Sequence, residues 1–140
     1  MTEHEIAGIE TAVGIALPAH YRWFLMEHAD TLRDAKQRLP MRAILYSEPG
    51  DIVWINKALR DNPHMIEVNE DEDPWPPNYF MIGTDGGGDY WMVDVDDSRE
   101  TFWRYDSESG GLIVPADFQS WAEYMAALKR DLEQPEKWQG

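Results

Sequence analysis

Three consecutive glycines between two apolar segments constrain the fold of this chain more than any other feature. Residues 80–83 and 90–94 have the composition of strands, and the glycines separate them with an aspartate on each side. Glycine adopts positive φ without steric cost, so the backbone can turn sharply there. A phosphate-binding loop would instead need a helix N-terminus and a nearby basic residue. We therefore predict a structural turn, formed by Gly83, Asp85, Gly86, Gly87, Gly88 and Asp89.

Apolar periodicity predicts helices toward both ends of the chain and strands between them. The predicted helices begin after Thr2 and at Pro18, Pro49 and Asp117. The predicted strands are residues 43–46, 79–83, 90–94, 101–105 and 112–114. This order favours the α+β class, as a single domain with a mainly antiparallel sheet and helices packed at both chain ends. We place the domain at residues 1–134 and expect residues 135–140 to form a loose tail.

Charge is the strongest signal in the composition. The 140 residues include 27 acidic and 12 basic side chains, for a net charge of −15. Such a chain repels nucleic acid and anionic membranes, so an electrostatic partner is expected to be a basic protein. The charge is also uneven, because 11 of the acids lie between Asp61 and Ser98 and no lysine or arginine does. A general role in solubility is the alternative explanation.

The sequence contains no recognisable catalytic or metal-binding motif. Cysteine is absent, no two histidines have metal-ligand spacing, and no serine lies in a nucleophile motif. We therefore expect neither a metal site, nor a cofactor, nor catalytic residues. The polar N-terminus lacks signal-peptide features, and no apolar run approaches the roughly 20 residues of a membrane span. We expect a cytoplasmic protein.

Residues 67–78 form an acidic and proline-rich segment that we predict to be a loop. Trp75 lies between prolines there, where it is either an exposed anchor for a partner or a buried anchor of the loop. Trp23, Trp91, Trp103 and Trp121 fall within periodic elements and are expected in the core. We predict a binding face made of Glu70, Asp71, Glu72, Asp73 and Trp75, extended by Asp94, Asp96 and Asp97.

Three blocks of this chain resemble the SUKH superfamily, which includes fungal cell-wall assembly regulators and bacterial immunity proteins. The first block is residues 14–18 followed by Tyr21, Phe24 and Leu25. The second is residues 82–90, and the third is Phe118 with Trp121. The family often has an Asn-Gly-Gly turn soon after the second helix, whereas Glu27 to Leu39 here keeps a helical pattern without glycine.

The resemblance implies a non-enzymatic binding domain and brings no catalytic residues. Bacterial members are typically immunity proteins that neutralise secreted toxins, often nucleases. The leading hypothesis is therefore an immunity protein that binds a basic toxin domain directly. The alternatives are an intracellular regulatory or scaffold module of the same fold and, more weakly, an uncharacterised hydrolase.

Overall fold

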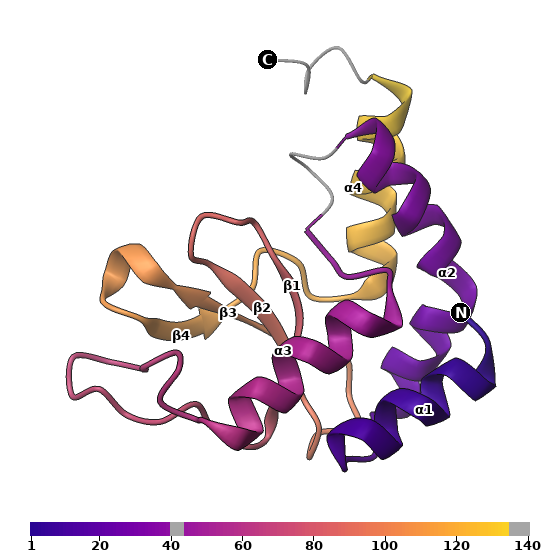
Figure 1. Cartoon of the computed structure of the whole chain (residues 1–140). Helices are drawn as coiled ribbons and strands as arrows, with labels where there is room; N and C mark the ends of the chain where they lie inside the picture. Colours follow the sequence, from indigo (N-terminus) through magenta and orange to yellow (C-terminus); the bar gives the residue numbers. More distant parts are fainter. Residues whose placement is uncertain (40–43, 135–140) are drawn as a thin grey trace.

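A four-stranded antiparallel sheet forms one part of the molecule, and four α-helices pack beside and across it (Figure 1). The computed structural model describes residues 1–39 and 44–134. The helices are α1 (Glu3–Val13), α2 (Ala19–Arg38), α3 (Pro49–Asp61) and α4 (Trp121–Glu133). The strands are β1 (Tyr79–Thr84), β2 (Tyr90–Asp94), β3 (Phe102–Asp106) and β4 (Leu112–Pro115). The α+β prediction is confirmed, while the predicted tail lies outside the described residues.

The strands follow one another across the sheet in the order β1-β2-β3-β4, and each pairs antiparallel with its neighbours. The β1–β2 and β3–β4 turns therefore share one end of the sheet. The β2–β3 turn lies at the opposite end. In Figure 1 the β1–β2 turn is the upper loop of the sheet and the β3–β4 turn is the loop on the left. The β2–β3 turn is the lower loop.

Strands β1 and β2 are buried on both faces of the sheet, whereas β3 and β4 are more exposed. On one face Phe80, Val93 and Phe102 pack into the main core with α1, α2 and α4. Trp121 at the start of α4 stacks on Phe24 of α2, with 3.9 Å between ring centroids. On the other face Met81 and Met92 pack beneath α3 and the segment that follows it. Alternating apolar side chains on the strands supply both cores, as the period of two in a strand requires.

The helix boundaries follow local signals, with one correction. Thr2 and Glu5 form a capping box at α1, and Gly14 ends that helix at a φ of 80°. The N-cap of α4 is Ser120, not Asp117, because the Ser120 side chain accepts the backbone N–H of Glu123. Asp117 instead accepts a hydrogen bond from Trp91 Nε1 at 3.2 Å.

The outer edge of β1 is covered by backbone from residues 44–46, within the predicted first strand. Tyr46 N–H donates to the carbonyl oxygen of Ile82, and Thr84 N–H donates to that of Ile44, both at 2.8 Å. This contact forms only an isolated bridge, between Leu45 and Gly83. A Cβ atom at Gly83 would lie 2.9 Å from Leu45 Cα, so Gly83 permits this close approach.

Asn56 fastens α3 to the same strand. Its side chain is buried and exchanges two hydrogen bonds with the backbone of Met81. Met81 N–H donates to Asn56 Oδ1 at 2.7 Å, and Asn56 Nδ2 donates to the Met81 carbonyl oxygen at 2.9 Å. A helix side chain thus takes the place of a neighbouring strand at this point.

Candidate partner-binding surface

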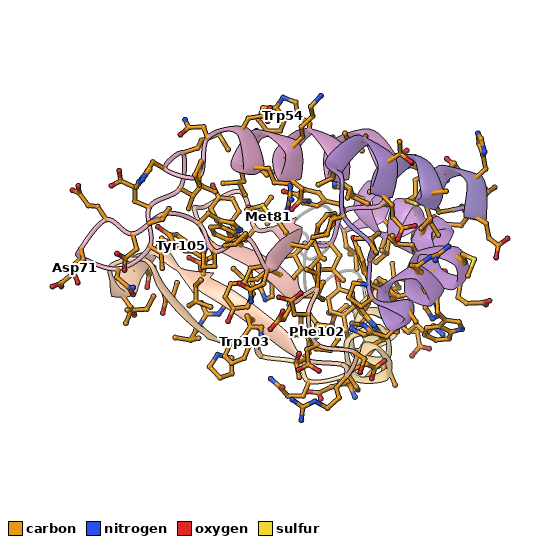
Figure 2. The ribbon with its side chains drawn as sticks, turned by 90° about the horizontal axis from the view of Figure 1, so that it is seen from below. Trp54, Asp71, Met81, Phe102, Trp103 and Tyr105 are labelled. Atoms are coloured by element: carbon orange, nitrogen blue, oxygen red, sulfur yellow. The ribbon has the colours of Figure 1, made fainter. Side chains whose placement is uncertain are left out.

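The acidic segment folds into a tight, well-defined turn at residues 69–72. Val68 and Asp73 exchange both of their backbone hydrogen bonds at 2.8 Å, which closes the turn. Asn69 and Glu72 have positive φ, at 65° and 57°. A side chain at positive φ is unfavourable, most of all for a residue such as Glu72 that is neither glycine nor asparagine. The carboxylates of residues 70–73 are all exposed, and Asp71 lies at the tip, far from the helices (Figure 2).

This turn is joined to the β3–β4 turn by two hydrogen bonds, each between residues that lie about forty positions apart in the sequence. Asn69 N–H donates to the Gly111 carbonyl oxygen at 3.1 Å, and the Tyr105 hydroxyl donates to the Glu67 carbonyl oxygen at 2.8 Å. Gly111 has a φ of 79°, and a Cβ atom there would meet the Tyr105 hydroxyl oxygen at 2.7 Å. The two acidic turns therefore form one continuous projection.

The glycine turn between β1 and β2 lies at the same end of the sheet. Asp85 Oδ1 accepts the N–H groups of Gly87 and Asp89, at 2.8 and 3.2 Å. Gly86 and Gly88 have φ values of 78° and 107°, whereas Gly87 is not among the residues with positive φ. The turn geometry thus depends on Gly86 and Gly88, and the Asp85 side chain holds the backbone between them.

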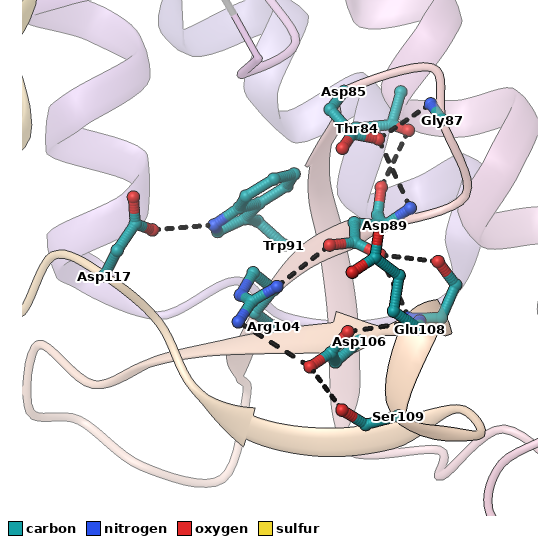
Figure 3. A network of polar contacts seen from close by, with 11 residues as sticks. Thr84, Asp85, Gly87, Asp89, Trp91, Arg104, Asp106, Glu108, Ser109 and Asp117 are labelled. Carbon is teal, nitrogen blue, oxygen red and sulfur yellow. Dashed lines mark hydrogen bonds and ion pairs between the residues drawn. The ribbon is translucent and has the colours of Figure 1, made fainter.

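Arg104 on β3 lies beside the glycine turn, and carboxylates neutralise it (Figure 3). Its guanidinium donates to Asp89 Oδ2 at 2.9 Å and lies 3.9 Å from Asp106 Oδ2. Burial opposes ionisation of Asp89, but hydrogen bonds from Ser107 and Arg104 outweigh it and lower the pKa of that carboxyl. Arg104 therefore contributes little net positive charge to the surface.

We name this surface the acidic end and define it by its exposed carboxylates. They are Glu67, Glu70, Asp71, Glu72, Asp73, Asp85 and Glu108. No lysine or arginine occurs in residues 61–98 or 105–128, which supply all three turns. The concentration of negative charge is thus a property of the fold as well as of the sequence.

Trp75 is a buried anchor of the loop, so the exposed-anchor interpretation is wrong. Its side chain is only 4% exposed and packs in the core beneath α3. The indole Nε1–H donates to the Tyr79 carbonyl oxygen at 2.9 Å, and the ring lies 6.0 Å from that of Tyr105. Trp75 holds the acidic segment against the sheet but offers no surface to a partner.

Asp94, Asp96 and Asp97 do not join the acidic end. They belong to the end of β2 and the β2–β3 turn, at the opposite end of the sheet. Asp97 pairs with Arg99 through two side-chain hydrogen bonds of 3.1 Å, and Arg99 lowers the pKa of this carboxyl to about 2. The predicted face therefore divides into two, because an antiparallel meander places successive turns at alternate ends.

Two exposed tryptophans were not anticipated. Trp54 on α3 is 69% exposed and points away from the sheet (Figure 2), and Trp23 on α2 is 47% exposed, which corrects its expected place in the core. Helical spacing could have located Trp54, since it lies off the buried stripe of Ile52, Ile55 and Leu59. Trp91 and Trp121 are buried as expected, and Trp103 is half-buried.

Comparison with known proteins then identifies the family. The family model described as SMI1 / KNR4 family (SUKH-1) matches residues 1–126, from α1 into α4. The chain belongs to the SMI1/KNR4 family (SUKH-1). Searches of curated proteins and of solved structures found no match. In this SUKH-1 protein the second helix runs unbroken from Ala19 to Arg38.

The described residues of this SUKH-1 protein contain no group of three or more histidine, aspartate or glutamate side chains placed to hold a metal ion. Across residues 1–39 and 44–134, no helix has the length and apolar character needed to cross a bilayer.

Proposed function

We propose that this SUKH-1 protein is a non-enzymatic binding module, an immunity protein that acts in the cytoplasm and neutralises a basic toxin domain by direct contact. The observation that carries the proposal is the acidic end, where seven exposed carboxylates gather on three turns and Arg104 beside them is already paired. Family membership supports a binding role in general. The negative charge of the surface favours a partner with a positively charged face.

The acidic end suits rapid capture of such a partner. Carboxylates on a projecting surface attract a basic protein over a distance of about 8 Å at physiological salt. They also resemble the phosphates that a nuclease binds, so the same surface can occlude a nucleic-acid site. Charges of this kind mainly set the association rate, whereas buried contacts set the dissociation rate.

The proposal is tested by charge reversal at the tip of the acidic end. We expect Glu70→Lys combined with Asp71→Lys to slow association by about tenfold or more and to flatten its salt dependence. Surface plasmon resonance at two salt concentrations measures both quantities. Where a toxin gene lies beside this gene, its toxin domain is the immobilised partner. Both side chains are exposed and form no hydrogen bond with other described residues, so the double variant should fold.

The matched control is Asp96→Lys combined with Glu100→Lys, which changes the net charge equally at the opposite end of the sheet. Both residues are exposed, and they lie in the segment between β2 and β3. We expect this control to associate almost as fast as the natural protein. Equal slowing in both double variants would show a general charge effect and contradict binding through the acidic end.

The regulatory or scaffold module remains the second candidate, because family membership fits it equally well. Gene context separates the two. A neighbouring gene for a secreted protein with a C-terminal toxin domain supports immunity, and its absence supports the regulatory module. Hydrolytic activity in the purified protein would support the hydrolase alternative and contradict both binding roles.

A further inference from the structure

A second site, separate from the acidic end, lies where α1 ends beside α3 and the proline-rich segment. It is a cleft of about 320 Å³. Its polar lining side chains include Asn56, Arg60 and the hydroxyl-bearing Tyr79, and the remaining lining residues are aliphatic, proline or aromatic. Small-molecule sites in proteins have this character, with apolar walls and few polar groups.

The walls of the cleft are held in place before any ligand arrives. Four of its lining residues are prolines, at positions 63, 74, 76 and 77. Trp75 N–H donates to the Pro63 carbonyl oxygen at 2.7 Å. This hydrogen bond holds Pro63, just after α3, against the prolines at 74, 76 and 77. Little conformational entropy is therefore lost when the cleft is filled.

Among these polar side chains, Arg60 is the one that carries a positive charge and is free to bind an anionic ligand. Both amide hydrogens of Asn56 are used, because Nδ2 donates to the carbonyl oxygens of Ile52 and Met81. Arg60 is exposed, and no carboxylate among the described residues forms an ion pair with it. Ion pairs do occupy Arg22, Arg33, Arg38, Arg99 and Arg104.

We propose that this cleft binds a small monocarboxylate with an apolar body. The carboxylate pairs with the Arg60 guanidinium, whose planar fork fits two carboxylate oxygens, and the body lies between Leu59 and the proline wall. At about 30 Å³ for each water-sized group, the volume accommodates roughly ten non-hydrogen atoms. Octanoate is close to that size.

Isothermal titration calorimetry with octanoate at physiological salt tests the proposal, with octan-1-ol as the uncharged probe. We expect saturable binding of one octanoate per chain and at least tenfold weaker binding of octan-1-ol. Arg60→Met keeps an unbranched, flexible side chain, although a shorter one, and removes the charge, so it should weaken octanoate binding at least tenfold. Arg60→Lys keeps a cation but loses the planar fork and should give an intermediate affinity.

The matched control is Lys57→Met, which removes the same charge from an exposed position one turn earlier on α3. Lys57 lines a different groove, beside Trp54, and not the cleft. We expect this variant to bind octanoate as the natural protein does. Absence of saturable binding, equal affinity for octanoate and octan-1-ol, or equal losses in Arg60→Met and Lys57→Met would each overturn the proposal. None of these outcomes bears on the acidic end, so the two proposals fail independently.

Discussion

Replacing Asn56 offers the sharpest test of how α3 is joined to the sheet. The Asn56 side chain is the partner of both the N–H and the carbonyl group of Met81, and both residues are buried. In Asn56→Ala these two backbone groups lose their side-chain partner, and only water entering from the adjacent cleft can replace it. Each buried, unsatisfied group costs about 1–3 kcal/mol, so we expect the free energy of unfolding to fall by up to about 6 kcal/mol, and by about 2 kcal/mol where water replaces part of the bonding.

A second substitution separates hydrogen bonding from packing. Leucine has the same branched skeleton as asparagine but no polar atom and more bulk, so Asn56→Leu leaves no cavity while leaving Met81 unsatisfied. We therefore expect Asn56→Leu to destabilise the protein by at least 1–2 kcal/mol as well. Asn62→Ala, at the exposed C-cap of the same helix, is the control and should change stability by about 0.5 kcal/mol or less.

Urea unfolding followed by tryptophan fluorescence measures these differences, with the slope against urea checked for constancy. Hydrogen exchange of the Met81 amide provides a local measurement, since its protection should fall in both Asn56 variants. If Asn56→Leu were as stable as the natural protein and Met81 kept its protection, the hydrogen bonds would not be what joins α3 to β1.

Two further predictions concern the glycine turn and Gly83, which was predicted in the turn but lies in β1. Gly83→Ala should lower the free energy of unfolding in urea by about 2–4 kcal/mol, because the new methyl group meets the backbone of Leu45. Gly87→Ala should change it by about 0.5 kcal/mol or less, since φ at Gly87 is not positive. Equal losses in the two variants would contradict the view that Gly83 is sterically required and Gly87 is not. The folded state lowers the pKa of Asp89 below its ordinary 3.8, so the ionised carboxylate adds stability above that pH, and this contribution is lost as the pH falls through the folded pKa. The stability difference between the natural protein and Asp89→Asn should therefore shrink from pH 6 to pH 3, and a difference independent of pH would refute this.

The sequence was sufficient to predict most elements, because each of them has a local signal. The apolar spacing of Ile6, Ile9 and Val13 defines α1, and the glycine turn separates β1 from β2. The start of α4 was misplaced because Asp117 and Ser120 are both acceptable N-caps, and only tertiary contacts choose between them. Asp117 is used by Trp91 instead.

The candidate surface was predicted only in part, because it depends on which turns meet. The acid run at residues 70–73 is visible in the sequence, but its junction with Gly111 is not. The aspartates at 94, 96 and 97 were grouped with it because they are close in sequence, although the sheet carries them to the other end. Trp75 illustrates a second limit, since proline neighbours fit an exposed and a buried side chain equally well.

The order of the strands has a consequence for how the protein forms during synthesis. Each strand pairs with the strand just made, so the sheet needs only short loops to close, and these cost little entropy. The outer edge of β1 is covered by residues 44–46 and Asn56, which are synthesised before any of the four strands. Only α4 arrives late, and until Trp121 stacks on Phe24 and meets the Phe102 ring edge to face, the main core stays open on one side. We therefore expect nascent chains that end before residue 121 to expose this aromatic face and to aggregate. Addition of α4 should cover the face and prevent this aggregation.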